Sequence, residues 1–160
     1  MDDAEAPERD GSAGIYARES DYLGRYVQIG VAGGRLLSLS FPESPDPSAG
    51  DDHELLDRVF AYLEGKRDGF RDVAVALAAA TEDHGILTAA REIPYGENAN
   101  VRQVARMATL DPDDADDLQR VRQALHDNPA PLVVPDHRVR DGPSAAPPTV
   151  EQRLRSLEGL

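Results

Sequence analysis

Apolar and polar residues alternate in the first half of the chain in the manner of a β-sheet. The segment 26–31 has an apolar residue at every second position, and 37–41 repeats this pattern after Gly33 and Gly34. Two alternating segments around a glycine pair predict a β-hairpin. A shorter alternation over 73–77 predicts a third strand.

The remaining apolar residues have the three- and four-residue spacing of helices. Polar residues that favour helix N-termini precede three of the predicted helices, at Thr81, Asn100 and Asp113, and Thr149 precedes the last one. The predicted helices cover 53–66, 81–92, 100–110, 113–127 and 149–157. The run of Val133 and Val134 between prolines is predicted to be a short buried strand.

These elements predict an α+β chain in two parts. Residues 1–14 are polar and acidic and are expected to form a disordered tail. A small α/β domain is expected over 15–78, and a mainly helical domain over 79–160. The apolar content of 40% suffices for a core. No membrane span or secretory leader is visible, so a cytoplasmic monomer is expected.

The charge balance is strongly acidic. Acidic residues number 30 and basic residues 17, for a net charge of −13, and Lys66 is the single lysine. This composition indicates adaptation to molar salt, where the Debye length is about 3 Å and self-repulsion is screened. The alternative is an ordinary acidic protein that avoids nucleic acid. On the salt interpretation, negative charge alone does not exclude a DNA partner.

Composition also excludes several kinds of chemistry. The chain has no cysteine, so disulfides, thiolate metal sites and thiol nucleophiles are excluded. Its four histidines lack metal-ligand spacing, and the acidic segment 111–117 lacks the glycine and the glutamate of a calcium loop. No glycine-rich loop is present to hold a phosphate. We therefore expect no metal and no cofactor.

Three motifs follow one another in the second half of the chain. IPYGE occupies 93–97, NPAPLVVPDHRV occupies 128–139, and LEG occupies 157–159. In this order they resemble the O6-alkylguanine-DNA alkyltransferases, also called methylated-DNA–protein-cysteine methyltransferases, over about 20–160. The resemblance implies an RNase-H-like N-terminal domain and a helical, winged-helix-like DNA-binding domain with a helix-turn-helix. It also implies a target base flipped into a pocket.

The resemblance places an aspartate where the family has its nucleophile. Asp136 occupies the position of the cysteine, while Asn128, His137 and Glu158 match its supporting residues. Because no cysteine remains, S-alkyl transfer is excluded, and a carboxylate is a poor nucleophile toward an alkyl ether. The sequence thus resembles the cysteine-less alkyltransferase-like proteins, which bind alkylated DNA and flag the lesion for excision repair.

This resemblance implies an interface with double-stranded DNA and a lesion pocket. The residues expected to contact DNA are Arg102, Gln119, Arg120, Arg122 and Arg138. The residues expected to line the pocket are Asn128, Pro135, Asp136, His137 and Ser144. Arg120 or Gln119 would replace the flipped base in the stack, and a repair-protein partner is expected.

One feature of the sequence opposes DNA binding. Five carboxylates within 111–117 lie in the predicted turn of the helix-turn-helix and should repel phosphates. Two alternatives therefore stay open. The chain could be a degenerate homologue that serves as a non-DNA interaction or regulatory module, or an enzyme that uses Asp136 and His137 as an acid–base pair.

Overall fold

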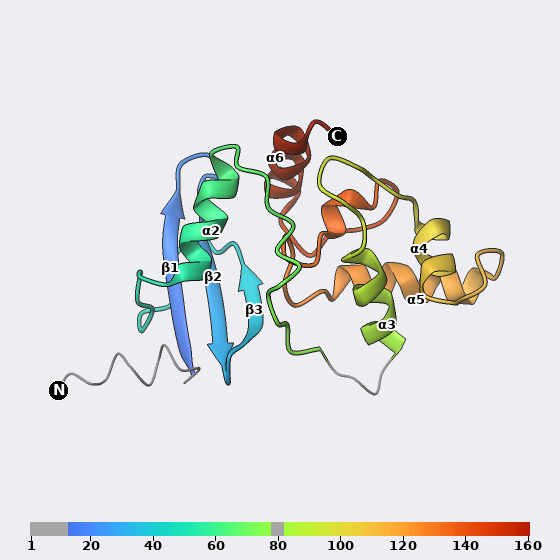
Figure 1. Ribbon diagram of the computed structural model, residues 1–160, viewed down its shortest axis with the longest axis horizontal. Helices are drawn as coiled ribbons and strands as arrows, with labels where there is room; N and C mark the ends of the chain where they lie inside the picture. Colours follow the sequence, from blue (N-terminus) through green and yellow to red (C-terminus); the bar gives the residue numbers. More distant parts are fainter. Residues whose placement is uncertain (1–12, 78–81) are drawn as a thin grey trace. The chain divides into compact units, whose positions relative to one another are not determined.

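The computed structural model describes residues 13–77 and 82–160, which form an α+β fold (Figure 1). They fall into two compact units, one within Met1–Ala76 and one within Leu77–Leu160. The described residues include a three-stranded antiparallel sheet and five α-helices. None of these helices has the length and apolar character needed to cross a membrane.

The first unit contains the sheet. Its strands are β1 (Gly14–Ser20), β2 (Arg25–Ala32) and β3 (Arg35–Ser40), in the order β1-β2-β3. The predicted hairpin is confirmed as β2–β3. Gly33 and Gly34 have φ angles of 60° and 76°, the left-handed conformation that a two-residue hairpin turn requires.

The third strand is β1, and the prediction of a strand over 73–77 is wrong. That segment contributes one isolated bridge between Val75 and Leu36. The sequence of β1 does not show the apolar alternation of a strand, because its inward face carries Tyr16 and Arg18, which pair with Ile29 and Val27 of β2. A polar side chain on the covered face removes the alternation by which strands are recognised.

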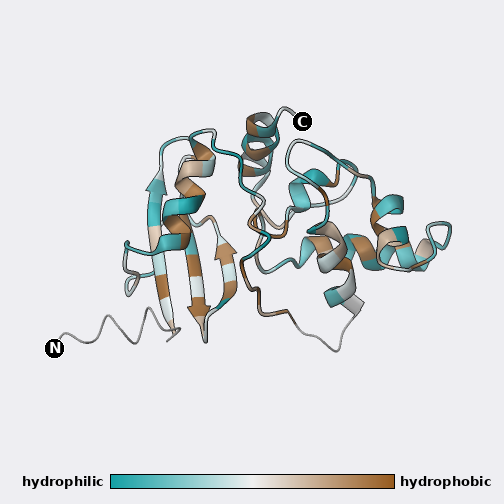
Figure 2. Cartoon of the chain, viewed as in Figure 1, coloured by the Kyte–Doolittle hydropathy of each residue, from teal (hydrophilic) through white to brown (hydrophobic). Residues whose placement is uncertain are grey.

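Helix α2 (Glu54–Leu63) packs against β1 and covers this face. Figure 2 shows the apolar bands of β2 and β3 and the apolar side of α2. Arg18 is accommodated there because its guanidinium lies 5.2 Å from the centre of the Phe60 ring and 3.1 Å from Asp57 Oδ1. Such a cation–π contact lets an arginine cover apolar surface.

The second unit consists of helices. They are α3 (Glu82–Ala90), α4 (Val101–Met107), α5 (Ala115–His126) and α6 (Pro148–Glu158), with a short 3-10 helix, η2 (Asp136–Arg138), before α6. Helices α3, α4 and α5 pack against one another, and α6 packs against η2. Val101, Val104, Val121 and Leu125 are fully buried where α4 and α5 contribute to the core.

Several predicted boundaries in this unit shift. Helix α4 ends at Met107 instead of 110, since Thr109 has a φ of 59°. The N-cap of α5 is Asp114 instead of Asp113, and that of α6 is Pro147 instead of Thr149. The predicted cap at Thr81 lies outside the described residues.

The segment 131–134 is a tight turn and not the predicted strand. Leu132 adopts a φ of 83°, and an isolated bridge joins Pro131 to Val134. All of 131–134 is buried. The apolar run therefore reflects burial alone, because a buried turn and a buried strand have the same hydropathy.

The predicted N-cap at Asn100 is confirmed and gives the first test. Its side chain accepts a hydrogen bond from Gln103 N at 2.8 Å, and the Gln103 side chain accepts from Asn100 N at 2.8 Å. Asn100→Ala should lower the free energy of unfolding by about 1 kcal/mol in urea denaturation. Asn100→Asp keeps the acceptor and should retain most of the stability; equal losses in both variants would contradict the capping role.

Candidate functional site

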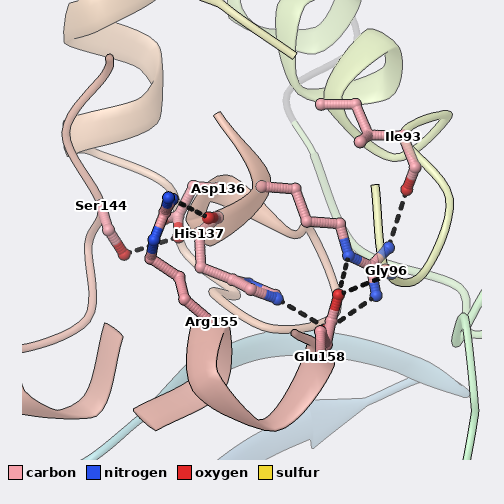
Figure 3. A network of polar contacts seen from close by, with 8 residues as sticks. Ile93, Gly96, Asp136, His137, Ser144, Arg155 and Glu158 are labelled. Carbon is pink, nitrogen blue, oxygen red and sulfur yellow. Dashed lines mark hydrogen bonds and ion pairs between the residues drawn. The ribbon is translucent and has the colours of Figure 1, made fainter. Parts of the chain in front are cut away.

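The candidate site is built on the loop that leads from α5 to η2. Asn128 holds this loop, since its Oδ1 accepts from Ala130 N at 3.0 Å and its Nδ2 donates to the Val134 carbonyl at 3.0 Å. The backbone then turns into η2, where Asp136 N donates to the Val134 carbonyl at 2.8 Å. The polar side chains of η2 are thereby directed into the protein interior, as Figure 3 shows.

The Asp136 carboxylate is buried in a cage of neutral donors. The residue is 1% exposed. Its Oδ1 accepts from the Ser144 hydroxyl at 2.6 Å, and its Oδ2 accepts from Asn128 Nδ2 at 3.0 Å and Ala145 N at 2.8 Å. Both oxygens are therefore occupied by groups of the protein itself, and the loop at 144–145 lies against the carboxylate.

Burial raises the pKa of the Asp136 carboxyl above its ordinary value. The hydrogen bonds from Ser144, Ala145 and Asn128 oppose this rise in pKa, as does the proximity of His137. No cationic side chain bonds to Asp136 in the described part of the chain, so desolvation dominates its titration.

His137 is fully buried beside Asp136 and faces a different carboxylate. Its Nε2 lies 2.8 Å from Glu158 Oε2. An ionised Glu158 accepts hydrogen bonds only, so this contact places a proton on Nε2. Among the described residues, Nδ1 has no hydrogen-bond partner.

The side chain of Glu158, the last residue of α6, accepts hydrogen bonds from two other segments and so connects three parts of the chain. Its carboxylate accepts from Arg138 Nε at 2.8 Å and Nη2 at 3.0 Å, in addition to the contact with His137. The backbone N of Gly96 donates to Oε1 at 3.1 Å. Arg138 Nη1 also donates to the Ile93 carbonyl at 2.7 Å. The motifs at 93–97, 128–139 and 157–159 therefore converge on one carboxylate.

The structure departs from the expected DNA-contact role of Arg138. The residue is 2% exposed, and its guanidinium is occupied by Glu158 and the Ile93 carbonyl. Reasoning from sequence also missed Arg155, whose Nη1 donates to the His137 carbonyl at 2.8 Å. The available signal was its position three residues before Glu158, on the same side of α6.

The other expected DNA-contact residues lie on α4 and α5. Arg102, Gln119 and Arg120 are exposed, and Arg122 is half-buried. Arg102 Nη2 pairs with Asp113 Oδ1 at 2.6 Å, and Arg120 Nη1 with Asp117 Oδ1 at 3.3 Å. The structure thus brings these basic residues to one helix pair, beside the acidic turn.

The expected pocket residues are brought together as well. Asp136 and His137 are adjacent in η2, and both Asn128 and Ser144 bond directly to Asp136. Asn128, Pro135, Asp136 and His137 are buried, while Ser144 is half-buried. The arrangement is a closed cluster in which the loop at 144–145 covers the carboxylate.

Comparisons with known proteins agree with this arrangement. Residues 81–144 match the family model described as the DNA binding domain of 6-O-methylguanine DNA methyltransferase. The methylated-DNA–protein-cysteine methyltransferase of Archaeoglobus fulgidus is 27% identical over 114 residues, which cover 71% of this chain and 72% of the relative.

Solved structures show that the fold is shared. The Mycobacterium tuberculosis O6-methylguanine methyltransferase matches with a TM-score of 0.69 at 21% identity, over 92% of this chain and 91% of that one. The O6-methylguanine-DNA methyltransferase of Pyrococcus kodakaraensis matches with a TM-score of 0.63 at 20% identity, over 92% and 99%. The sequence matches thus show a likeness to this methyltransferase family, centred on its DNA-binding domain at 81–144, and the solved structures show the same fold.

The raised pKa of Asp136 predicts a pH-dependent stability. The folded protein holds this proton more tightly than the unfolded chain, whose pKa is near the ordinary 3.8. The free energy of unfolding should therefore fall as pH rises from 3.8 through the higher folded-state pKa. Asp136→Asn should abolish this contribution, because its oxygen can accept from Asn128 and Ala145 while its NH₂ donates to Ser144.

The measurement is urea denaturation of both proteins from about pH 4 to about pH 8. Asp136→Ala serves as the control, since it leaves three donors without an acceptor and should lose about 1–3 kcal/mol relative to Asp136→Asn. A stability difference between wild type and Asp136→Asn that does not change with pH would contradict the raised pKa.

Proposed function

We propose that this protein recognises O6-alkylguanine-type lesions in duplex DNA by base flipping and does not transfer the alkyl group. The match of 81–144 to the family's DNA-binding domain supports a role in DNA repair or lesion binding, and one similar structure, the Mycobacterium tuberculosis OGT, is in complex with DNA. That structure matches this chain with a TM-score of 0.68 at 24% identity, over 92% of each chain.

The caged carboxylate of Asp136 is the observation that carries the proposal. It stands where the resemblance places the nucleophile, and none of the 160 residues is a cysteine. Both of its oxygens are engaged by protein donors, and hydrogen bonding lowers the reactivity of a carboxylate that is already a weak nucleophile. The supporting pair of His137 and Glu158 is nevertheless in place.

The DNA contact that we propose uses α4 and α5 as a helix-turn-helix in a winged-helix-like domain. Helix α5 would enter the groove, and Arg120 or Gln119 would fill the space of the flipped base. Arg102 and Arg122 would bind backbone phosphates, which position the protein without reading sequence. We interpret the first unit, with its three antiparallel strands and α2, as a reduced RNase-H-like domain.

Admission of a base requires the cage to open. Since Asp136 is 1% exposed, a flipped base can reach it only if Ser144 and Ala145 move away. Binding of a lesion would then exchange these hydrogen bonds for contacts with the base. The energy of lesion recognition is reduced by the cost of breaking them.

Two observations favour the alternative of a non-DNA interaction module. The site is closed, and Arg102 and Arg120 are both occupied by carboxylates. The remote alternative of an acid–base enzyme gains no support, because His137 Nε2 bonds to Glu158 and both Asp136 and His137 are buried.

Fluorescence anisotropy with matched duplexes tests lesion recognition. A duplex with one O6-methylguanine should bind more tightly than the undamaged duplex across a series of potassium chloride concentrations. About six phosphate contacts would give a log–log salt slope near −5, so low salt must be included. Equal and weak binding of both duplexes at every salt concentration would overturn the proposal in favour of the interaction module.

Arg120→Ala tests the residue that fills the stack. We expect it to weaken lesion binding by about tenfold, because an intercalated side chain stabilises the extruded state. Arg153→Ala on α6 removes the same charge away from the helix pair and is the control. Equal losses of lesion affinity in both variants would indicate a general charge effect. If Arg120→Ala binds the lesion like wild type and Gln119→Ala binds it more weakly, Gln119 is the residue that fills the stack.

Asp136→Cys tests the absence of alkyl transfer. Wild type should take up no label from DNA that carries a radioactive O6-methyl group, whereas Asp136→Cys should become labelled, since His137 and Glu158 already stand beside the thiol. Asp136→Ser loses the same hydrogen bonds and is the unreactive control. Labelled wild type would contradict the proposal, and an Asp136→Cys protein that binds the lesion without labelling would show that residue 136 does not face the alkyl group.

A further inference from the structure

The basic residues of the helix pair are matched by carboxylates of the adjacent turn. Arg102 on α4 pairs with Asp113 at 2.6 Å, and Arg120 on α5 pairs with Asp117 at 3.3 Å. These arginines are the same ones that the proposed function assigns to phosphate and to the base stack. A carboxylate and a phosphate oxygen make the same kind of charge-assisted hydrogen bond with a guanidinium.

The turn is held in shape by its own carboxylates. Asp111 Oδ1 accepts from Asp113 N at 2.9 Å, and Asp117 Oδ2 accepts from Asp111 N at 2.9 Å. Asp114 caps α5 by accepting from Asp116 N at 3.2 Å. Because these bonds fix the backbone, Asp113 and Asp117 are presented to the arginines at little further cost in conformational entropy.

We propose that Asp113 competes with DNA phosphates for Arg102 and so weakens sequence-independent binding to the DNA backbone, and that Asp117 competes with the base stack for Arg120. This inference rests on the proposed function, because it requires α4 and α5 to face DNA. Four carboxylates of 111–117 then have assigned roles: Asp113 and Asp117 occupy cations, while Asp111, Asp114 and again Asp117 accept the backbone hydrogen bonds that shape the turn.

Competition has a specific signature in the salt dependence. An unpaired arginine that neutralises a phosphate releases about 0.9 of a counterion from DNA. An arginine that leaves a carboxylate exposes a new anion beside the DNA, which retains part of the local cation atmosphere and so reduces the net release. Each occupied arginine should therefore reduce the magnitude of the log–log salt slope by up to about 0.9.

The affinity should change less than the slope. Both partners of the Arg102–Asp113 pair are solvent-exposed, at 52% and 74% of their side chains. Exposed pairs of this kind are weak, so removing the carboxylate should tighten DNA binding by up to about fivefold. Because backbone contacts are common to all duplexes, lesion and undamaged DNA should gain by the same factor.

Asp113→Asn in the full-length protein is the direct test, because Asp113 is exposed and its carboxylate is bonded to Arg102. Anisotropy titration of an undamaged and an O6-methylguanine duplex across potassium chloride concentrations should show tighter binding and a slope steeper by up to about 0.9. Asp116→Asn is the matched control. It removes the same charge three residues further on, in the first turn of α5, and within 82–160 Asp116 pairs with no arginine, so its slope should equal that of wild type.

A double-mutant cycle with Arg102→Gln separates competition from simple repulsion. If Asp113 acts by occupying Arg102, then Asp113→Asn should change neither the slope nor the affinity in the Arg102→Gln background. A gain in DNA affinity that persists in the Arg102→Gln background, or that Asp116→Asn reproduces, would overturn the competition. Such a result would leave the proposed DNA binding intact. Failure of every variant, Asp113→Asn included, to bind either duplex at low salt would overturn the proposed function and the inference together.

Discussion

The carboxylate of Glu158 is the interaction on which the rest of the site depends. It accepts hydrogen bonds from His137, Arg138 and Gly96, and so joins α6, η2 and the turn at 93–97. Removing one partner from such a buried ionic cluster costs about 3–5 kcal/mol, because a desolvated charge is left behind. Helix α6 ends immediately afterwards at Gly159, whose φ of 80° makes the left-handed C-cap. The glutamate is thereby fixed at the point where the three motifs meet.

Asp136 is the second buried carboxylate, and its surroundings differ in one decisive respect. Glu158 is bonded to a guanidinium, whereas Asp136 is bonded to an amide side chain, a hydroxyl and a backbone NH. Neutral donors compensate a buried charge less completely, which is why burial raises the pKa of Asp136. The closed loop at 144–145 supplies two of these three donors. The closed loop and the acidic group at position 136 therefore depend on each other, because the loop donates the hydrogen bonds that the carboxylate accepts.

Sequence alone predicted the site better than it predicted the fold around it. Asn128, Asp136, His137 and Glu158 lie in motifs whose order could be matched, and the structure brings them together. Arg138 could not be placed correctly, because arginine is almost always exposed unless paired and its partner lies 20 residues away. Similarly, β1 was missed because Arg18 faces α2, and the turn at 131–134 was mistaken for a strand because apolar runs report burial and not backbone conformation.

The acidity of the chain and its proposed affinity for DNA are compatible when the charges are considered pair by pair. A net charge of −13 opposes DNA as a long-range field, and that field is screened within about 3 Å at molar salt. In the proposed complex the local pairs would act differently, since Arg102 would exchange Asp113 for a phosphate. An exchange that releases few counterions is insensitive to salt. If α4 and α5 bind DNA as proposed, carboxylates beside the basic residues would therefore weaken that binding in dilute buffer and make it less sensitive to the concentrated salt that the composition predicts.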